Sequence, residues 1–313
     1  MTSDPRRVFV LTHAGRPQAC EVAATLSRAL LDHGVSLRML ADEAAALGMG
    51  HDAVELVGQE GASGAGCELM VVVGGDGTIL RASELARDSL TPLLGINLGH
   101  VGFLAEAEQE DLDLVISSIV DRAYTIEDRL TIDVTLFHDK QQVARTWALN
   151  EASVEKAARE RMLEVVVEVD GRPLSRWGAD GVVCATPTGS TAYNFSAGGP
   201  IVWPGVDALL VVPISAHALF ARPMVVAPTS VLAVEVLAGN ASSGVLWCDG
   251  RRTYDLPPGA RIEVRRGVAP VRLARVHAAP FTDRLVRKFG LPVDGWRGAA
   301  ERRRNGSPTE AGA

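Results

Sequence analysis

The stretch that decides the fold is VVVGGDGT, residues 71–78, in which an apolar β-branched run ends in three glycines around one carboxylate. A helix-like pattern over 78–87 follows at once. Glycines allow backbone N–H groups to close on a phosphate, and a helix start adds the positive end of its dipole. The stretch therefore predicts a phosphate-binding turn that joins a buried strand to a helix.

The carboxylate of Asp76 is the unusual part of this turn, because a negative charge at the centre of a phosphate site repels the ligand. Either a metal ion neutralises it, or it removes a proton from a hydroxyl group. Arg81 lies one helical turn after Thr78 and can reach an anion at the same helix end. The alternative is a tight strand–helix turn in which Asp76 only caps the helix. The turn is not a Walker motif, since no Lys follows its last glycine, and its spacing does not match the dinucleotide fingerprint.

Strand and helix patterns alternate through the first half of the chain. Strands are predicted over 7–12, 35–40, 69–73 and 93–96, and helices over 17–33, 78–87 and 108–121. A weak helix and a loop are expected over 41–66. Residues 97–103 are expected to form a glycine-punctuated turn, which either contributes to a functional site or only connects two elements. This alternation predicts an open, Rossmann-like α/β sheet, whose ligands bind beyond the C-terminal strand ends, where residues 74–77 fall.

The second half is mostly β. Short strands are predicted over 131–137, 143–149, 162–169, 173–177, 181–185, 231–237, 245–248, 261–264 and 271–276. Asp170-Gly171 is a strong two-residue hairpin signal between two of them, and the one convincing helix in this half opens near Thr191. A further helix over Phe281–Phe289 is ended by Gly290 and Pro292.

The expected fold class is therefore α/β followed by β, in four segments. An α/β domain spans 1–123, and a β-rich, β-sandwich-like domain spans 124–278. A C-terminal segment over 279–297 is expected to return its helix to the first domain. Residues 298–313, which are charged and small, are expected to form a disordered tail.

Composition excludes several classes of protein. A net charge of −7 and a pI near 5.6 argue against nucleic acid as the partner. No apolar run approaches the ~18 residues of a membrane-spanning helix, and no signal-peptide core follows the N-terminus, so we expect a cytoplasmic protein without a membrane partner. The four cysteines form no CxxC pair and have no histidine at metal-ligand spacing, which predicts buried thiols and no structural zinc site.

Two stretches of the second half carry polar groups suited to a nucleoside. Asn150-Glu151 places an amide and a carboxylate at the end of a β run, where they can bind a diol such as ribose. After Asp180, the segment TPTGSTAYNFSAGGP, residues 186–200, crowds five hydroxyl side chains into its first half. Hydroxyls and exposed N–H groups recognise sugars and phosphates without adding charge. The alternative for this segment is a Ser/Thr turn at the surface.

In their order and spacing these motifs resemble those of the NAD kinases. The similar segments are 74–78, 95–103, 149–151 and 180–200, then Val212-Pro213 with His217, Arg222-Pro223-Met224 and Cys248-Asp249-Gly250. The resemblance covers residues 8–297, and residues 280–291 with Trp296-Arg297 are similar to the actinobacterial type. The GGDGT turn alone is also shared with phosphofructokinases and diacylglycerol-type lipid kinases, so residues 186–200 are the specific part.

The resemblance implies an enzyme that phosphorylates the 2′-hydroxyl of the adenosine ribose of NAD, with ATP or inorganic polyphosphate, to give NADP. Asp76 is then the general base, and Gly74, Gly75, Gly77 and Arg81 meet the donor phosphates. A divalent metal ion, most simply Mg²⁺, is implied without protein residues assigned as its ligands. A homodimer or homotetramer with a site shared between subunits is implied as well.

By their positions in the motifs, Asn150 and Glu151 are implied to bind the ribose and adenine of NAD. Asp180 resembles the carboxylate that meets the nicotinamide end, often from a neighbouring subunit. The segment implied to contact the adenine side comprises Thr188, Thr191, Ala192, Tyr193, Asn194, Phe195 and Ser196. Ser215 and Arg161 are further implied contacts. Some relatives have Arg where this chain has Gly178, so any phosphate contact from that position must come from elsewhere.

Two other functions stay open at this point. A lipid or sugar kinase shares the glycine turn, although the chain lacks a membrane-binding amphipathic stretch, which argues against the lipid version. A nucleotide-binding sensor without catalysis would use the same pockets. Its main activity would not depend on the carboxylate of Asp76.

Overall fold

The computed structural model describes residues 6–50, 54–59, 63–99, 102–105, 107–108, 111–159, 161–276 and 280–293. The chain divides into one compact unit, Met1–His277, and a second unit, Ala278–Ala313. In the described part of the chain no helix is long and apolar enough to cross a membrane.

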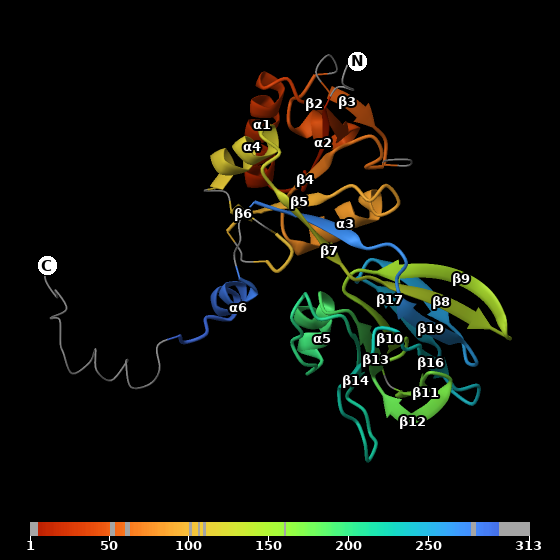
Figure 1. Ribbon diagram of the computed structural model, residues 1–313. Coiled ribbons are helices and arrows are strands. Elements are labelled where there is room, and N and C mark those ends of the chain that lie inside the picture. The colour runs from red at the N-terminus through yellow and green to blue at the C-terminus, as the bar shows by residue number, and fades with distance from the viewer. Residues whose placement is uncertain are drawn as a thin grey trace, which may run out of the picture. The chain divides into compact units, whose positions relative to one another are not determined.

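An eight-stranded sheet forms the first half of the larger unit, in the order β3-β2-β1-β4-β5-β20-β7, with β6 paired to β5 (Figure 1). Its strands are β1 (Arg7–Thr12), β2 (Ser36–Leu40), β3 (Val54–Val57), β4 (Leu69–Val73), β5 (Leu93–Asn97), β6 (Ala107–Glu108), β7 (Thr125–Arg129) and β20 (Val271–Arg275). The pairings among β1 to β5 are all parallel, which confirms the Rossmann-like prediction. The strand β3 was not predicted, because its four residues lie at the sheet edge in a region rich in Ala and Gly.

Helices cover this sheet because their apolar residues repeat every three or four positions. They are α1 (Pro17–Asp32), α2 (Ala41–Ala46), α3 (Asp76–Ala86) and α4 (Leu112–Val120). In α1 the buried positions Val22, Leu26 and Leu30 lie on one face, and Pro17 occupies the first turn as expected. Helix α3 begins two residues before the predicted start, so that Asp76 itself belongs to its first turn.

The second half contains two six-stranded antiparallel sheets in its described residues, ordered β15-β14-β13-β10-β17-β18 and β12-β11-β16-β19-β8-β9. Their strands are β8 (Ile132–His138), β9 (Gln141–Ala148), β10 (Glu151–Lys156), β11 (Leu163–Val169), β12 (Arg172–Ala179), β13 (Gly181–Ala185), β14 (Leu209–Ile214), β15 (Met224–Val226), β16 (Leu232–Val236), β17 (Gly244–Cys248), β18 (Arg252–Leu256) and β19 (Arg261–Arg266). Residues of both sheets, such as Val165, Trp177 and Leu246, share one buried cluster. This arrangement confirms the β-rich, sandwich-like prediction.

Several details differ from the expectations. The strands β7 and β20 pair with each other in the first sheet, although the sequence assigned both to the β-rich domain. The division of the chain at 123 and 278 stays a prediction. The helix expected near Thr191 is reduced to a 3₁₀ turn, Gly189–Thr191, and the single turn α5 (Tyr193–Ser196), because Gly198 turns the chain away at a φ of +83°.

The second unit contains α6 (Phe281–Phe289), whose bounds agree with the prediction. Gly290 ends it with a φ of +58°. The return of this helix to the first domain stays a prediction. Residues 298–313, expected to be a disordered tail, lie outside the described residues.

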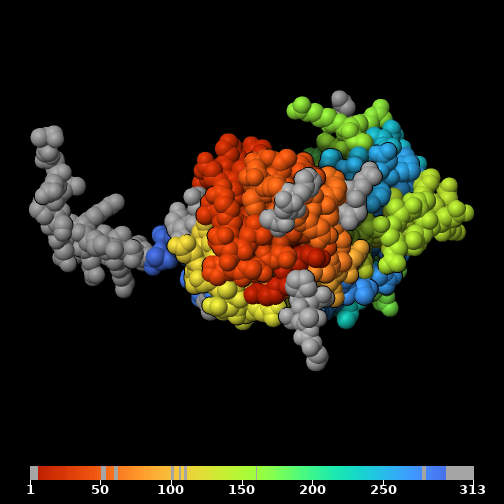
Figure 2. Space-filling view, turned by 90° about the horizontal axis from the view of Figure 1, so that it is seen from above, coloured from red at the N-terminus to blue at the C-terminus, as the bar shows by residue number. Residues whose placement is uncertain are grey.

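The two halves of the larger unit share a buried core. Leu149, directly after β9, belongs to the same cluster as Val72 of β4 and Ile79 of α3, and Trp147 packs against that cluster. In the space-filling view the red and orange surface of the first half directly adjoins the green and blue surface of the second (Figure 2). The stretch that leads into Asn150 is therefore anchored close to the glycine turn.

Candidate functional site

The glycine turn joins β4 to α3 in a conformation that needs its glycines. Gly74 has a φ of +157°, and a Cβ at this position would lie 2.5 Å from Thr78 Oγ1. A Cβ at Gly75 or Gly77 would meet no atom within 4 Å, so both positions face open space. Gly75 is the N-cap of α3, and no side chain caps the helix. The helix start thus presents backbone N–H groups to a ligand.

The carboxylate of Asp76 is held by the loop that follows β5. Phe103 N–H donates to Asp76 Oδ2 at 3.1 Å, and Leu104 N–H donates to Oδ1 at 3.2 Å. A Cβ at Gly102 would overlap Oδ1, so the loop approaches the carboxylate as closely as glycine allows. The N-cap is Gly75, and the alternative in which Asp76 merely caps the helix is wrong. The described residues of the glycine-punctuated turn therefore position the Asp76 side chain, and whether the turn is functional stays a prediction. His100 lies outside the described residues.

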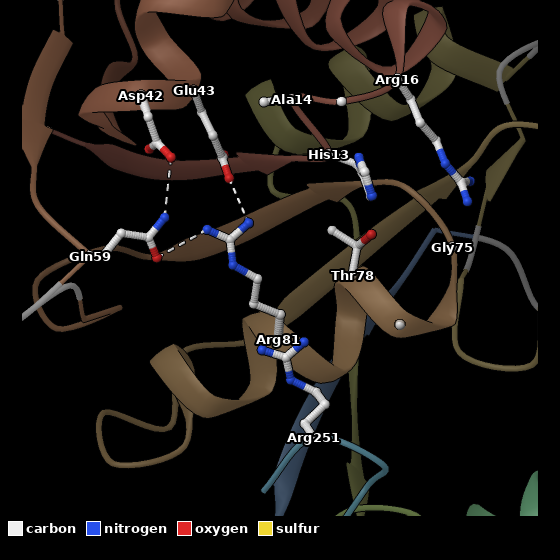
Figure 3. Close-up of a pocket in the computed structure, with 12 residues that line it drawn as sticks. His13, Ala14, Arg16, Asp42, Glu43, Gln59, Gly75, Thr78, Arg81 and Arg251 are labelled. Carbon is white, nitrogen blue, oxygen red and sulfur yellow. Dashed lines mark hydrogen bonds and ion pairs between the residues drawn. The ribbon is translucent and has the colours of Figure 1, made fainter.

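A cavity of about 600 Å³ opens beside the glycine turn (Figure 3). Its lining residues come from the loop after β1, from α2, from the residues after β3, from the start of α3 and from the β17–β18 turn: His13, Ala14, Gly15, Arg16, Asp42, Glu43, Gln59, Gly75, Gly77, Thr78, Arg81 and Arg251. The adjacent C-terminal ends of parallel strands form it, which is where ligands bind in open α/β sheets. Arginines from three different elements give it a positively charged wall suited to phosphates.

Arg81 is fixed in this cavity by Glu43, as Figure 3 shows. Its guanidinium donates to Glu43 Oε1 at 2.8 Å and to Gln59 Oε1 at 3.3 Å. Glu43 is buried, and its Oε2 accepts the N–H of Thr12 at 2.8 Å. Burial raises the pKa of Glu43, while the hydrogen bonds from Thr12 and Arg81 oppose the rise. The sequence predicted Arg81 as a phosphate contact but gave no sign of this carboxylate partner.

A second constellation surrounds the corner between β9 and β10. The buried carboxylate of Asp249 accepts the N–H of Leu149 at 2.9 Å and the N–H of Asn150 at 2.7 Å. On the other side, Thr186 donates its Oγ1–H to Leu149 O and its N–H to Asn150 O. The Asn150-Glu151 pair is therefore clamped between the β17–β18 turn and the hydroxyl-rich segment.

Glu151 is buried beside Asp249, and one of its carboxylate oxygens has no hydrogen-bond partner among the described residues. Burial first, and then the charge of Asp249, raise the pKa of Glu151 to about 8, although the backbone N–H of Tyr193 opposes the rise. No hydrogen-bond partner among the described residues reaches Glu151 Oε2. A buried polar atom without a partner is costly, so this oxygen is suited to bind a ligand hydroxyl.

Asp180 and Tyr193 lie near this carboxylate. Burial, together with the charges of Glu155 and Glu151, raises the pKa of the Tyr193 hydroxyl, and Asp180 adds to the effect. Asp180 is partly exposed, and its Oδ1 lies 2.6 Å from Lys156 Nζ. The structure thus brings three of the expected residues, Glu151, Asp180 and Tyr193, to one region.

The remaining expected residues divide into two groups. Thr188 is buried at the start of the 3₁₀ turn, and Thr191 donates to its carbonyl, while Ala192, Phe195 and Ser196 follow on the same segment. Asn194 is fully buried, and its amide donates to Ser190 O and Pro200 O and so braces the segment, while its Oδ1 has no hydrogen-bond partner among the described residues. Its contact with a ligand stays a prediction.

Two expected residues lie apart from this segment. Ser215 is exposed after β14 with a φ of +47°. Arg161 is exposed before β11, and within the described ranges no hydrogen bond or ion pair joins it to the other site residues.

Sequence reasoning missed several residues of both regions. Asp249 and Thr186 hold the Asn150 corner, whereas Arg16, Glu43 and Arg251 line the cavity. Arg16 follows β1, the parallel neighbour of β4, so strand adjacency would have placed it near the glycine turn. Asp249 stood in a motif that the resemblance included, but nothing local indicates that it accepts the backbone N–H groups of the β9–β10 corner.

Comparison with known proteins gives two family matches that together cover most of the chain. Residues 8–124 match the ATP-NAD kinase N-terminal domain, and residues 149–276 match the ATP-NAD kinase C-terminal domain. The second match lies in the β-rich half, outside the glycine turn that lipid and sugar kinases share.

Similar chains include actinobacterial proteins. NAD kinase 2 of Streptomyces coelicolor is 60% identical over 295 residues, covering 94% of this chain and 97% of that protein. The NAD kinase of Thermobifida fusca is 59% identical over 308 residues, covering 96% and 94%. A yeast NADH kinase crystallised with NADH superposes with a TM-score of 0.85 at 23% identity, covering 93% and 89%. An NAD kinase from Archaeoglobus fulgidus in complex with ATP gives a TM-score of 0.65 at 25% identity, covering 91% and 97%.

The raised pKa of Glu151 predicts a pH-dependent stability. Its folded pKa of about 8 exceeds the ordinary 4.5, so the folded state binds more protons between these values. The stability that depends on the neutral acid is present below pH 4.5 and is lost as the pH rises toward 8. Because Glu151→Gln stays neutral, we expect its Tm to exceed that of the unmodified protein at about pH 8.5, with a smaller difference at about pH 5.

Thermal unfolding followed by circular dichroism at both pH values measures this difference. Glu21→Gln, an exposed substitution on α1, is the control and is expected to show no pH-dependent change. The same Tm difference for Glu151→Gln at both pH values would contradict the expectation.

Proposed function

This chain belongs to the NAD kinase family, and on that premise we propose that Asp76 is the general base for phosphoryl transfer to the 2′-hydroxyl of the adenosine ribose of NAD, which gives NADP. One observation carries the proposal: the Asp76 carboxylate is held by Phe103 and Leu104 at the helix start that the phosphate-binding glycines form. A ribose hydroxyl is a weak nucleophile until its proton is removed, and a carboxylate in reach can remove it.

The phosphoryl donor occupies the cavity beside this turn. Backbone N–H groups at Gly75 and Gly77 meet its phosphates, and Arg16, Arg81 and Arg251 balance their charge. Among the described residues that line the cavity, none is Phe, Tyr or Trp. Recognition of phosphates rather than of a stacked base supports ATP or inorganic polyphosphate as the donor.

NAD binds across the β-rich side of the site. The ribose hydroxyls meet Asn150 and the unpartnered Oε2 of Glu151, which as a neutral acid also offers one O–H donor. The segment over 188–196 borders the adenine, and Asp180 meets the nicotinamide end. Because Asp180 is partly exposed, we propose that a neighbouring subunit of a homo-oligomer completes the site for the nicotinamide end.

A divalent cation, most simply Mg²⁺, fits this donor set. No group of three or more Asp, Glu, His or Cys residues in the described ranges forms a protein cage for a metal. In phosphoryl-transfer sites Mg²⁺ takes one or two carboxylates together with substrate phosphates, and Asp42, whose carboxylate lines the donor cavity, would hold it here. When bound, the ion would supply neutralisation of the charge on the transferred phosphoryl group.

Removing the base tests the proposal directly. With NAD, ATP and Mg²⁺ we expect the unmodified protein to form NADP, and we expect Asp76→Asn to lower kcat by roughly 10²–10⁴-fold with NAD binding retained. Coupled NADP detection gives kcat, and calorimetry gives the Kd for NAD. Asp113→Asn is the control, because Asp113 is an acidic residue in the first turn of α4. Unchanged kcat in Asp76→Asn would contradict the role of this carboxylate as the base, whereas an unmodified protein that forms no NADP would favour the sensor without catalysis.

The loop that holds Asp76 predicts a second effect. In Gly102→Ala the new Cβ would overlap Asp76 Oδ1 and push the carboxylate off its two N–H donors. We expect kcat to fall about 10²-fold, because a displacement on the order of 1 Å has this effect on a reacting group. Gly239→Ala, where a Cβ meets open space, is the control and is expected to keep full activity. Equal kcat values for the two variants would contradict the positioning role of the loop.

The cavity predicts a selective effect on the donor. Arg16→Gln removes a cation from the cavity and is expected to raise the KM for ATP about tenfold, which corresponds to one charge-assisted hydrogen bond of ~1.4 kcal/mol. The KM for NAD is expected to stay unchanged. Arg28→Gln, an exposed change on helix α1, which follows Arg16, is the control. A rise in the KM for NAD alone would place the donor elsewhere.

A further inference from the structure

Helix α3 carries, besides Asp76, a carboxylate that contacts the other half of the unit. Glu84 lies near the end of this helix, and its Oε1 accepts a hydrogen bond from Arg251 Nε at 3.1 Å. Arg252 Nε lies 3.2 Å from the same oxygen. Both arginines belong to the β17–β18 turn region, so Glu84 ties the helix of the catalytic base to the β-rich half.

Arg252 continues this connection to the Asn150 corner. Its guanidinium Nη2 donates to Asp249 Oδ2 at 2.8 Å. That same carboxylate accepts the N–H groups of Leu149 and Asn150. Burial raises the pKa of Asp249, and the N–H donors and Arg252 oppose the rise. An unbroken series of polar contacts therefore runs from α3 to the pair that binds the ribose.

Stacking fixes the orientation of Arg252. Its guanidinium carbon lies over the ring of Trp147, 4.6 Å from the centroid. Arg87, the C-cap of α3, lies over the same ring at 4.6 Å from the centroid, and its Nη2 is 2.7 Å from Asp133 Oδ1 of β8. Because Trp147 also packs against the core cluster shared by both halves, the arginine has little freedom to turn.

We propose that Glu84, Arg252 and Asp249 are positioning residues that set the place of Asp76 relative to the Asn150-Glu151 pair, so that the base meets the ribose hydroxyl. The inference rests on the proposed function of Asp76. These contacts lie at the boundary of the two halves, whose separate elements hold the base and the acceptor. The ion pairs of Glu84 are partly exposed and add little to stability, whereas a shift on the order of 1 Å between reacting groups lowers the rate about 10²-fold.

Glu84→Gln and Arg252→Lys test the proposal, because each keeps most of the side-chain volume. We expect either change to lower kcat at least tenfold while the Kd for NAD changes less than about twofold. Since Glu84 also holds Arg251 of the donor cavity, Glu84→Gln is expected to raise the KM for ATP as well, and Arg252→Lys is not. The double variant should lose no more than the larger single effect, because the residues act as one unit.

Glu55→Gln provides the matched control. Glu55 also pairs with two arginines, Arg7 and Arg38, but all three residues lie in the first sheet. We expect its kcat to stay within about twofold of the unmodified protein. Kinetics with NAD, ATP and Mg²⁺ are read beside calorimetric Kd values for NAD and the Tm of each variant.

The outcomes separate the positioning role from the proposed function. If kcat is unchanged in both Glu84→Gln and Arg252→Lys, the positioning role is overturned while the proposed function of Asp76 stands. A kcat loss that follows the loss of Tm in every variant, the control included, overturns it too, because that result indicates a merely structural contribution. An unmodified protein that forms no NADP overturns the proposed function instead.

Discussion

The arrangement of the site depends on two backbone hydrogen bonds, in which the N–H groups of Phe103 and Leu104 hold the carboxylate of Asp76. They resolve the conflict that the sequence poses, a negative charge inside a phosphate-binding turn. The charge lies in the first turn of α3, where the helix dipole favours an anion, and the loop fixes its direction. Gly102 is needed because any Cβ would overlap the carboxylate. The glycine turn and the loop after β5 thus act together to fix the position of the Asp76 carboxylate.

Two buried acids, Asp249 and Glu151, lie at the β9–β10 corner and differ in what their oxygens contact. Asp249 has its oxygens occupied by backbone N–H groups and Arg252, so it serves as a fixed anchor. Glu151 keeps one oxygen without a partner, and burial beside Asp249 raises its pKa to about 8. Such a site is unfavourable for the free protein and favourable for a ligand that supplies the missing hydrogen bond. The unpartnered oxygen of Glu151 is a local exception to the rule that buried polar atoms are hydrogen-bonded.

The sequence was informative wherever local pattern decides the result. Apolar runs located β1 and β4, and the hairpin signal Asp170-Gly171 appears as a turn with both residues at positive φ. Pairing between distant segments could not be read locally, which is why the sequence placed the residues of β7 and β20 in the β-rich domain, whereas these strands pair with each other in the first sheet. Asp249 reaches Asn150 only because β17 pairs with β10. The close packing of Gly199 against the buried amide of Asn194 could not be read locally either.

The role of Asp76 as the base depends most on where the acceptor hydroxyl lies relative to its carboxylate. A crystal structure of this protein with NAD and a non-hydrolysable ATP analogue measures that distance directly. We expect the ribose 2′-oxygen within about 2.6–3.2 Å of an Asp76 carboxylate oxygen, with Phe103 and Leu104 still donating to that side chain. A 2′-oxygen beyond the reach of Asp76, with the 2′-hydroxyl bonded to another side chain, would contradict the role of this carboxylate as the base.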